Sequence, residues 1–165
     1  MKKTNGLHAE AALEANKNIA RAFVEGLHDL TATKCSALMS DTGTWQVMAR
    51  TKSLPLGDPL SKSEFASMMQ TMRGFFPLGV RHEVKSMTAE GDRVAVETES
   101  FANMPGGGNY NNVYHFLIVV QDSKITLVRE YTDLLYAKEV VFDQPLVSQM
   151  VKQAAGTIFH IGPEG

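Results

Sequence analysis

Four long segments rich in β-forming residues follow one another in the second half of the chain, with very short connections between them. The segments cover residues 80–89, 93–103, 110–121 and 125–134. The connections are Glu90-Gly91-Asp92, a glycine-rich stretch over 104–109 and Asp122-Ser123-Lys124. Connections this short join antiparallel neighbours, so the pattern predicts an antiparallel meander. Any fold of this chain has to contain that meander.

The first half of the chain is mainly helical in pattern. We expect helices over 8–28 and 32–39, a strand over 44–50, a loop over 51–60, and short helices over 135–142 and 145–155. Ser61-Lys62-Ser63-Glu64 is a capping box, so a further helix begins there and should stop near Gly74, ahead of Phe76-Pro77. Helices followed by a meander predict an α+β fold. We expect a cone-shaped, curved antiparallel (mixed) sheet, wrapped by the N-terminal helices around an interior cavity.

Length, charge and cysteine content restrict the class of protein. The 165 residues suit a single domain over 1–165, with a core over about 10–142 and a C-terminal tail over 143–165. A net charge of −2 argues against nucleic-acid binding. One cysteine, and histidines without metal-ligand spacing, predict neither a metal site nor another cofactor. The longest apolar run covers only 117–120 and no targeting segment is visible, so we expect no membrane association and a cytoplasmic location.

The segment over 110–120 carries apolar residues on both of its faces. Phe116, Ile118 and Val120 lie on one face, and Leu117 and Val119 lie on the other. An antiparallel sheet in a monomer usually leaves one face wet, which gives a cleaner alternation. We therefore predict that helices cover one face, and that a second copy of the chain covers the other in a homodimer formed through the sheet.

The order of elements and one motif set resemble a known superfamily. The motifs are Tyr110-x-Asn112-x-Tyr114, the Asp122-Ser123-Lys124-Ile125 turn and Arg129-Glu130-Tyr131-Thr132-Asp133. They are similar to patterns of the nuclear transport factor 2-like superfamily, above all of its SnoaL-like polyketide cyclases and phenazine-biosynthesis A/B proteins. Ketosteroid isomerase and limonene-epoxide hydrolase also belong to it. The resemblance covers about 12–142 and implies the conical fold, whereas the reaction differs among members.

Several residues of those relatives have no counterpart here. Val47 and Phe23 occupy the approximate positions of the ketosteroid-isomerase base and oxyanion tyrosine, and Met68 that of the phenazine-protein histidine. Trp45 and Val47, then Thr98 and Ser100, stand where the epoxide-hydrolase pattern has most of its water-activating groups. The acidic residue of the Arg-Asp-Tyr part of that pattern survives as Glu130, which also resembles the functional glutamate of the phenazine proteins.

Three residues are candidates for catalysis. If the superfamily's orientation holds, Glu130 points into the cavity, where burial would raise its pKa and suit it to general acid–base work. The alternative is a structural ion pair. His82 shares a face with Val80 and Val84 and could hydrogen-bond Glu130, or could be an ordinary core histidine. Tyr114 could stabilise charge on a ligand oxygen, or be a core aromatic residue.

A second set of residues is expected to bind the substrate. Asn112 offers an amide on the same face as Tyr114, and Trp45 is expected to line the cavity. Nine methionines suit an adaptable apolar pocket, although simple core filling explains most of them equally well. The predicted substrate-binding residues are Asn112, Trp45, Met48, Met69, Met72, Phe116 and Val128.

These observations favour a cofactor-independent enzyme that acts on a small hydrophobic ligand. Its reaction would be an isomerisation, cyclisation or hydrolysis of a carbonyl, epoxide or polyketide-like substrate, with Glu130 moving a proton, His82 assisting and Tyr114 stabilising charge. The alternative is a non-catalytic protein that binds a hydrophobic ligand in the same cavity. A purely structural dimerisation domain is a third hypothesis. It would leave costly polar groups in the cavity without a purpose.

Overall fold

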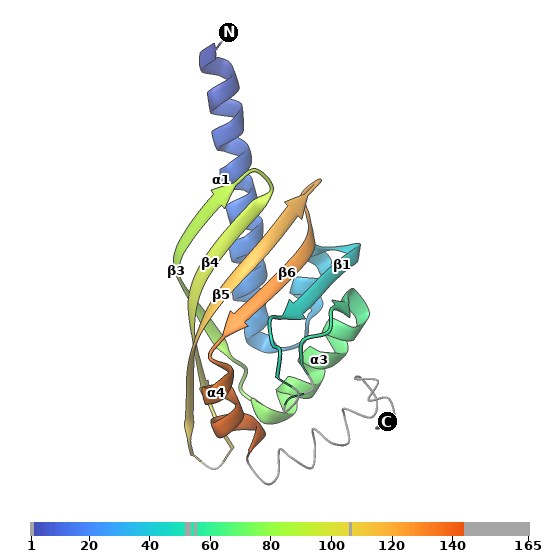
Figure 1. Cartoon of the computed structure of the whole chain (residues 1–165), viewed down its shortest axis with the longest axis vertical. Helices are drawn as coiled ribbons and strands as arrows, with labels where there is room; N and C mark the ends of the chain where they lie inside the picture. The colour runs from blue at the N-terminus through green and yellow to red at the C-terminus, as the bar shows by residue number, and fades with distance from the viewer. Residues whose placement is uncertain (1, 52–53, 55, 106, 144–165) are drawn as a thin grey trace.

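A computed structural model of the chain describes residues 2–51, 54, 56–105 and 107–143. Its centre is a six-stranded mixed sheet in the order β2-β1-β6-β5-β4-β3 (Figure 1). The bounds are β1 Met39–Val47, β2 Leu60–Ser61, β3 Arg81–Glu90, β4 Arg93–Asn103, β5 Asn109–Gln121 and β6 Lys124–Thr132. β1 runs parallel to β6, and every other neighbouring pair is antiparallel. The sheet remains open, because β2 and β3 form its two edges. The predicted α+β class and mixed sheet are confirmed.

The predicted meander is present as β3 to β6, because two tight turns allow it. Gly91 has a φ of +58° in the turn between β3 and β4. Asp122 and Ser123, between β5 and β6, both have positive φ, at 50° and 59°. Two successive residues of that kind match the right-handed twist of a hairpin. Each strand lies within two residues of its predicted bounds.

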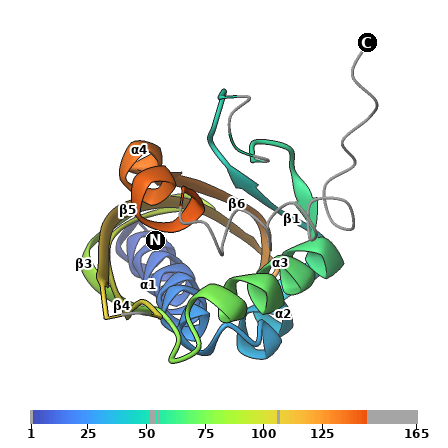
Figure 2. The same cartoon turned by 90° about the horizontal axis from the view of Figure 1, so that it is seen from below.

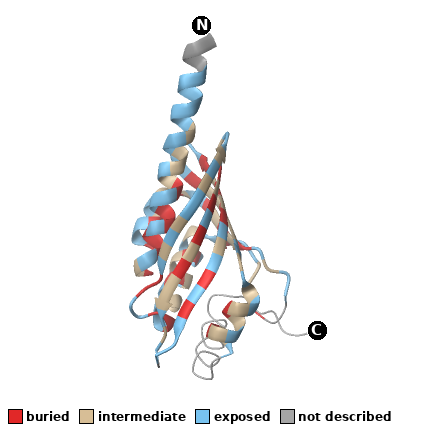
Figure 3. Cartoon of the chain, turned by 90° about the vertical axis from the view of Figure 1, so that its left-hand side faces the viewer, coloured by how far each residue is buried: buried red, intermediate tan, exposed pale blue. Residues whose placement is uncertain are grey.

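Helices cover the concave face of the sheet. α1 (Lys2–Gly26) contacts β3, β4, β5 and β6, while α3 (Lys62–Phe75) contacts β1. Seen from below, the sheet curves around both helices (Figure 2). Along β4 and β5 buried residues alternate with more exposed ones (Figure 3). The buried apolar residues of these strands belong to the same core cluster as Phe23 and Val24 of α1. Among the described residues no helix is both long and apolar enough to span a membrane.

The helix bounds agree with the predictions at most ends. α1 is followed by a 3₁₀ turn, η1 (Leu27–Asp29), and then by α2 (Thr33–Leu38). The capping box of α3 is present, because the Ser61 hydroxyl accepts from the Glu64 amide and the Glu64 side chain accepts from the Ser61 amide. α4 (Leu134–Ala137) and the π-helical turn η2 (Lys138–Phe142) form the helix expected over 135–142. The helix predicted over 145–155 lies outside the described residues.

The start of the chain and the first strand differ from the predictions. α1 begins at Lys2 and not at residue 8, since helical backbone continues without an apolar stripe. β1 begins at Met39 and ends at Val47, whereas a strand over 44–50 was predicted. Its early part lacks alternation and is a strand because Met39 pairs with Ile125 of β6. β2 lies at the end of the predicted loop over 51–60, where Leu60 pairs with Trp45.

Gly79 offers a test of how the chain enters β3. It has a φ of +84°, and a Cβ placed there would collide with the His28 carbonyl oxygen, which accepts the Val80 amide at 3.0 Å. Gly91 also has a positive φ, but a Cβ there meets nothing within 4 Å. We expect Gly91→Ala to lower the free energy of unfolding by about 1 kcal/mol. Gly79→Ala should lower it by roughly 3 kcal/mol or more, because a buried clash adds to the strain.

Urea unfolding of the two variants measures this difference. Equal losses for Gly79→Ala and Gly91→Ala would contradict the close approach of Gly79 to His28.

Candidate active site

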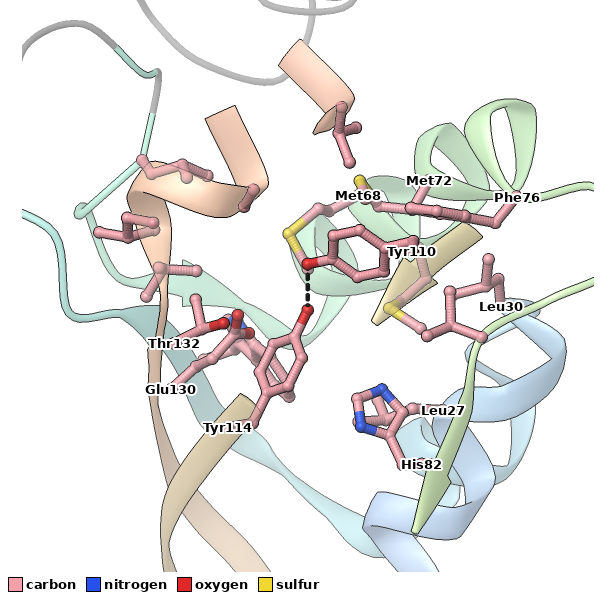
Figure 4. Close-up of a pocket in the computed structure, with 18 of the residues that line it drawn as sticks. Leu27, Leu30, Met68, Met72, Phe76, His82, Tyr110, Tyr114, Glu130 and Thr132 are labelled. Carbon is pink, nitrogen blue, oxygen red and sulfur yellow. Dashed lines mark hydrogen bonds between the residues drawn. The ribbon is translucent and has the colours of Figure 1, made fainter. Parts of the chain in front are cut away.

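A pocket of about 120 Å³ lies at the concave face, between the sheet, α3 and the segment 134–142. Its walls are mostly apolar and aromatic, and Figure 4 shows the polar groups that enter it. The lining residues used below are Trp45, Met68, Met69, Met72, Phe76, His82, Tyr110, Tyr114, Phe116, Glu130 and Thr132. No lysine or arginine lines the pocket among the described residues.

Glu130 reaches the pocket because of its position in β6. Its backbone pairs with Phe116 of β5 on one side and with Val47 of β1 on the other. These neighbours offer no polar side chain, and no hydrogen bond or ion pair of the carboxyl is found within the described residues. Burial alone raises the pKa of Glu130 to about 8. At neutral pH the carboxyl is therefore mostly protonated, yet close to ionisation.

Tyr110 and Tyr114 form the second polar feature of the pocket. Both project from β5 on the same face, and their hydroxyl oxygens are 2.8 Å apart (Figure 4). Burial, above all other causes, raises the pKa of Tyr110 to about 12 and that of Tyr114 well above its ordinary value. Both phenols therefore remain neutral hydrogen-bonding groups at any physiological pH.

His82 projects from β3 on the other side of Tyr114. Its ring centroid lies 5.2 Å from that of Tyr114 and 6.0 Å from that of Phe116, both edge to face. Burial, with a smaller contribution from His28, lowers the pKa of His82 to about 4, so the imidazole is neutral. Its buried Nδ1 has no hydrogen-bond partner among the described residues. The hydrogen bond to Glu130 that the sequence suggested is not formed, because Tyr114 lies between the two side chains (Figure 4).

Seven of the ten predicted site residues line the pocket, and three do not. Asn112 is buried behind it and donates to the Tyr110 hydroxyl at 2.8 Å and to the Asp133 carbonyl at 3.1 Å. Val128 is fully buried, two residues before Glu130 in β6, where its backbone pairs with Trp45 of β1. Met48 lies beyond the end of β1, with its side chain 37% exposed. These three residues do not line this pocket, and their contact with a ligand stays a prediction.

Two polar residues of the pocket were not predicted as site residues. Tyr110 follows from the alternation that places Asn112 and Tyr114 on one face of β5, so the signal was present in the sequence. Thr132 lies on the same face of β6 as Glu130, two residues further along. The contribution of the segment 134–142 had no signal, because only the tertiary fold brings it over the sheet.

A metal centre finds no support in the described part of the chain. Within it, no group of three or more histidine, cysteine, aspartate or glutamate side chains lies close enough to hold a metal ion. The pocket itself offers one carboxyl and one imidazole, on opposite sides of Tyr114.

The sequence of residues 20–128 matches the family described as SnoaL-like domain. No curated protein matches the chain significantly. Similar solved structures include PrhC from Penicillium brasilianum, with a TM-score of 0.75, 14% identity and coverage of 87% of this chain and 96% of that one. At identities this low, the likeness concerns the fold.

Two further structures share the fold. IdmH from Streptomyces antibioticus, described as a putative polyketide cyclase, has a TM-score of 0.63 and 16% identity over 73% of this chain and 94% of that one. A hypothetical protein from Catenulispora acidiphila with a ketosteroid isomerase-like fold, in complex with trimethylamine, has a TM-score of 0.60 and 15% identity, over 70% of this chain and 85% of that one.

Replacing Glu130 by glutamine is expected to stabilise the fold increasingly as the pH rises. The pKa of Glu130 is about 8 in the folded chain and near its ordinary value of 4.5 when unfolded. The wild type therefore loses stability as the pH rises between these values, whereas Glu130→Gln does not. Its advantage over the wild type should grow by roughly 5 kcal/mol between pH 4 and pH 9, as measured by urea unfolding.

Glu99→Gln is the matched control. Hydrogen bonds from Asn111 and Lys85 lower the pKa of Glu99, so this variant should gain no stability over the wild type as the pH rises. An advantage of Glu130→Gln that stays constant from pH 4 to pH 9 would contradict a buried, unpaired carboxyl.

Proposed function

The chain belongs to the SnoaL-like domain family, and on that premise we propose that it is a small-molecule enzyme that uses Glu130 for general acid–base chemistry. The reaction would be an isomerisation, cyclisation or hydrolysis of a small hydrophobic carbonyl, epoxide or polyketide-like substrate. The observation that carries the proposal is the Glu130 carboxyl in an apolar pocket, with a pKa raised by burial to about 8. A group that titrates near the working pH is efficient at both accepting and returning a proton.

The tyrosine pair is assigned to the charge that develops on a ligand oxygen. Asn112 donates to the Tyr110 hydroxyl, and one of the two tyrosine hydroxyls donates to the other. The internal bond uses one of the two hydroxyl hydrogens. In this proposal the other is donated to a ligand oxygen, in competition with Thr132, which also hydrogen-bonds Tyr114. A neutral donor held in place within an apolar pocket stabilises an oxyanion more than water does.

Asn112 and His82 have supporting roles in this proposal. Asn112 is a positioning residue, because its amide is held by the Asp133 carbonyl and by the Val113 amide, 2.8 Å from its Oδ1. Its bond to Tyr110 thereby sets the direction of that hydroxyl. His82 is a neutral imidazole that lines the pocket, so in this proposal it contacts the substrate and does not act as a relay to Glu130.

A non-catalytic protein that binds a hydrophobic ligand is the second candidate. The missing bond between His82 and Glu130 favours it, because no side chain among the described residues orients the carboxyl. The Catenulispora relative with bound trimethylamine supports small-molecule binding by this fold. Cofactor-independent chemistry, the single-domain organisation and the cytoplasmic location remain predictions from the sequence.

We also propose a homodimer through the convex face of the sheet. Val113 of β5 and Tyr131 of β6 lie on that face and are 62% and 42% exposed. A hollow of about 590 Å³ is lined by both of these residues and by Lys85 and Glu97. A second copy would cover these apolar residues.

Proton exchange on an enolisable ketone tests the enzyme proposal. We expect the wild type to accelerate deuterium uptake by the α-carbon of 2-tetralone in D₂O, followed by NMR, because ionised Glu130 removes that proton. The rate should rise about tenfold per pH unit and level off near pH 8, where the carboxyl is ionised. Glu130→Gln should abolish the acceleration and leave ketone binding, read from Trp45 fluorescence, within about twofold.

Glu90→Gln, at the end of β3 and exposed, is the control and should exchange at the wild-type rate. Tight binding of the ketone without Glu130-dependent exchange would refute the enzyme proposal and support the non-catalytic binding protein. No binding of the ketone would contradict both candidates.

Light scattering at micromolar concentration tests the dimer. The wild type should have the mass of two chains, and Val113→Glu should shift it to the mass of one, because it places a charge within the apolar contact. Leu78→Glu is the control, since Leu78 is 74% exposed in the loop before β3. A monomeric wild type would refute the dimer.

A further inference from the structure

The Glu130 carboxyl differs from the other carboxylates of the sheet in having no partner. Glu83 lies 2.8 Å from Lys85 and 3.2 Å from Arg81, and Glu99 lies 3.0 Å from Lys85. Glu130 has no such contact within the described residues, although it is the one enclosed in the pocket. Buried carboxylates are normally paired or hydrogen-bonded, because an isolated buried charge is costly. Its ionised form therefore needs a positive group that enters the pocket.

The pocket walls favour the same sign of charge. Five aromatic rings form an aromatic wall in the pocket that holds the carboxyl, contributed by Trp45, Phe76, Tyr110, Tyr114 and Phe116. Tyr114 and Phe116 stack at 5.7 Å, and Phe116 lies 5.8 Å from Trp45, so these three rings are neighbours. The faces of aromatic rings carry negative potential and attract alkylated ammonium groups. With no lysine or arginine in the described lining, nothing there compensates the charge of an anionic ligand.

We infer that the pocket selects ligands that carry a positively charged, alkylated nitrogen, held between the Glu130 carboxylate and the aromatic wall. This inference rests on the proposed function and deepens it by naming the substrate class. The methionines of α3, Met68, Met69 and Met72, complete the pocket with soft apolar surface that suits the methyl groups of such a nitrogen.

A positive ligand would also activate Glu130. Nearby positive charge favours the ionised carboxylate, so it lowers the pKa that burial has raised to about 8. Binding of a permanent cation at neutral pH then releases the Glu130 proton to solvent and leaves the carboxylate, the form that a general base requires. The substrate itself would convert the resting acid into the base.

The other titratable groups that face Glu130 stay neutral throughout this range. They are His82 from β3 and Tyr110 and Tyr114 from β5. The pKa of His82 is about 4 and that of Tyr110 about 12, while that of Tyr114 is raised further above its ordinary value. The lining residues from β1, from α3 and from the segment 134–142 have no ionisable side chain. A change in binding between pH 5.5 and pH 9 therefore reports on Glu130.

Choline and its uncharged analogue 3,3-dimethyl-1-butanol, which replaces the nitrogen by carbon, test the inference. Binding to the full chain is measured by calorimetry and by the fluorescence of Trp45, the only tryptophan. At pH 8 we expect choline to bind about tenfold more tightly than the analogue. Its Kd should fall about tenfold in all between pH 5.5 and pH 8 and level off above pH 8, with proton release below pH 8. The analogue's Kd should not change with pH.

Two variants separate the effect of charge from that of shape. Glu130→Gln should abolish both the preference for choline and its pH dependence, while the Kd of the analogue stays within about twofold. Glu90→Gln should behave as the wild type, which excludes a general effect of net charge.

Three outcomes would overturn the inference: equal affinity for the two ligands, a choline preference that survives in Glu130→Gln, or no binding of choline. Glu130-dependent exchange on the ketone would leave the proposed function standing in each case. If the wild type shows no such exchange but still prefers choline, the enzyme proposal is refuted and the inference about the ligand class stands.

Discussion

The packing of Trp45 against three phenylalanines holds the site together. Its ring lies 4.8 Å from Phe65 of α3, 5.9 Å from Phe23 of α1 and 5.8 Å from Phe116 of β5. One side chain of β1 thus joins both covering helices to the middle of the sheet, and burial of such large rings is a major source of stability. The pocket opens beside this cluster, so Trp45 and Phe116 belong both to the core and to the pocket wall.

Burial by that packing shifts the pKa of each ionisable group in the pocket so that its neutral form is favoured. Burial raises the pKa of Glu130 and of both tyrosines and lowers the pKa of His82. In each case the low-dielectric surroundings penalise the charged form, so all four side chains are mainly neutral at pH 7. Glu130 is the group nearest to its titration point. A small change in its surroundings, such as a ligand charge, therefore changes its state, whereas it leaves the other three unchanged.

The sequence predicted elements whose signals are local. The capping box at Ser61 placed the start of α3, and the turns at Gly91 and Asp122 placed the hairpins, because each depends on neighbouring residues alone. Alternation along β6 also put Glu130 opposite Arg129 and Tyr131. The early start of β1 and the presence of β2 were missed, since both depend on pairing with strands far away in the chain. Met48 was chosen because methionine suits an apolar pocket, and residue type alone does not fix where a side chain lies.

By itself the sequence determined the class of fold and the antiparallel meander, because periodicity and turn geometry are properties of short segments. The resemblance to the superfamily then singled out Glu130 as the candidate carboxyl. Only the tertiary structure decided what surrounds that carboxyl. In it, Tyr114 lies between His82 and Glu130, and Asn112 donates to the Tyr110 hydroxyl from behind the pocket. The segment 134–142 contributes to the pocket wall. These relations depend on how the curved sheet aligns residues of different strands, and strand register across long chain separations is a property of the folded whole.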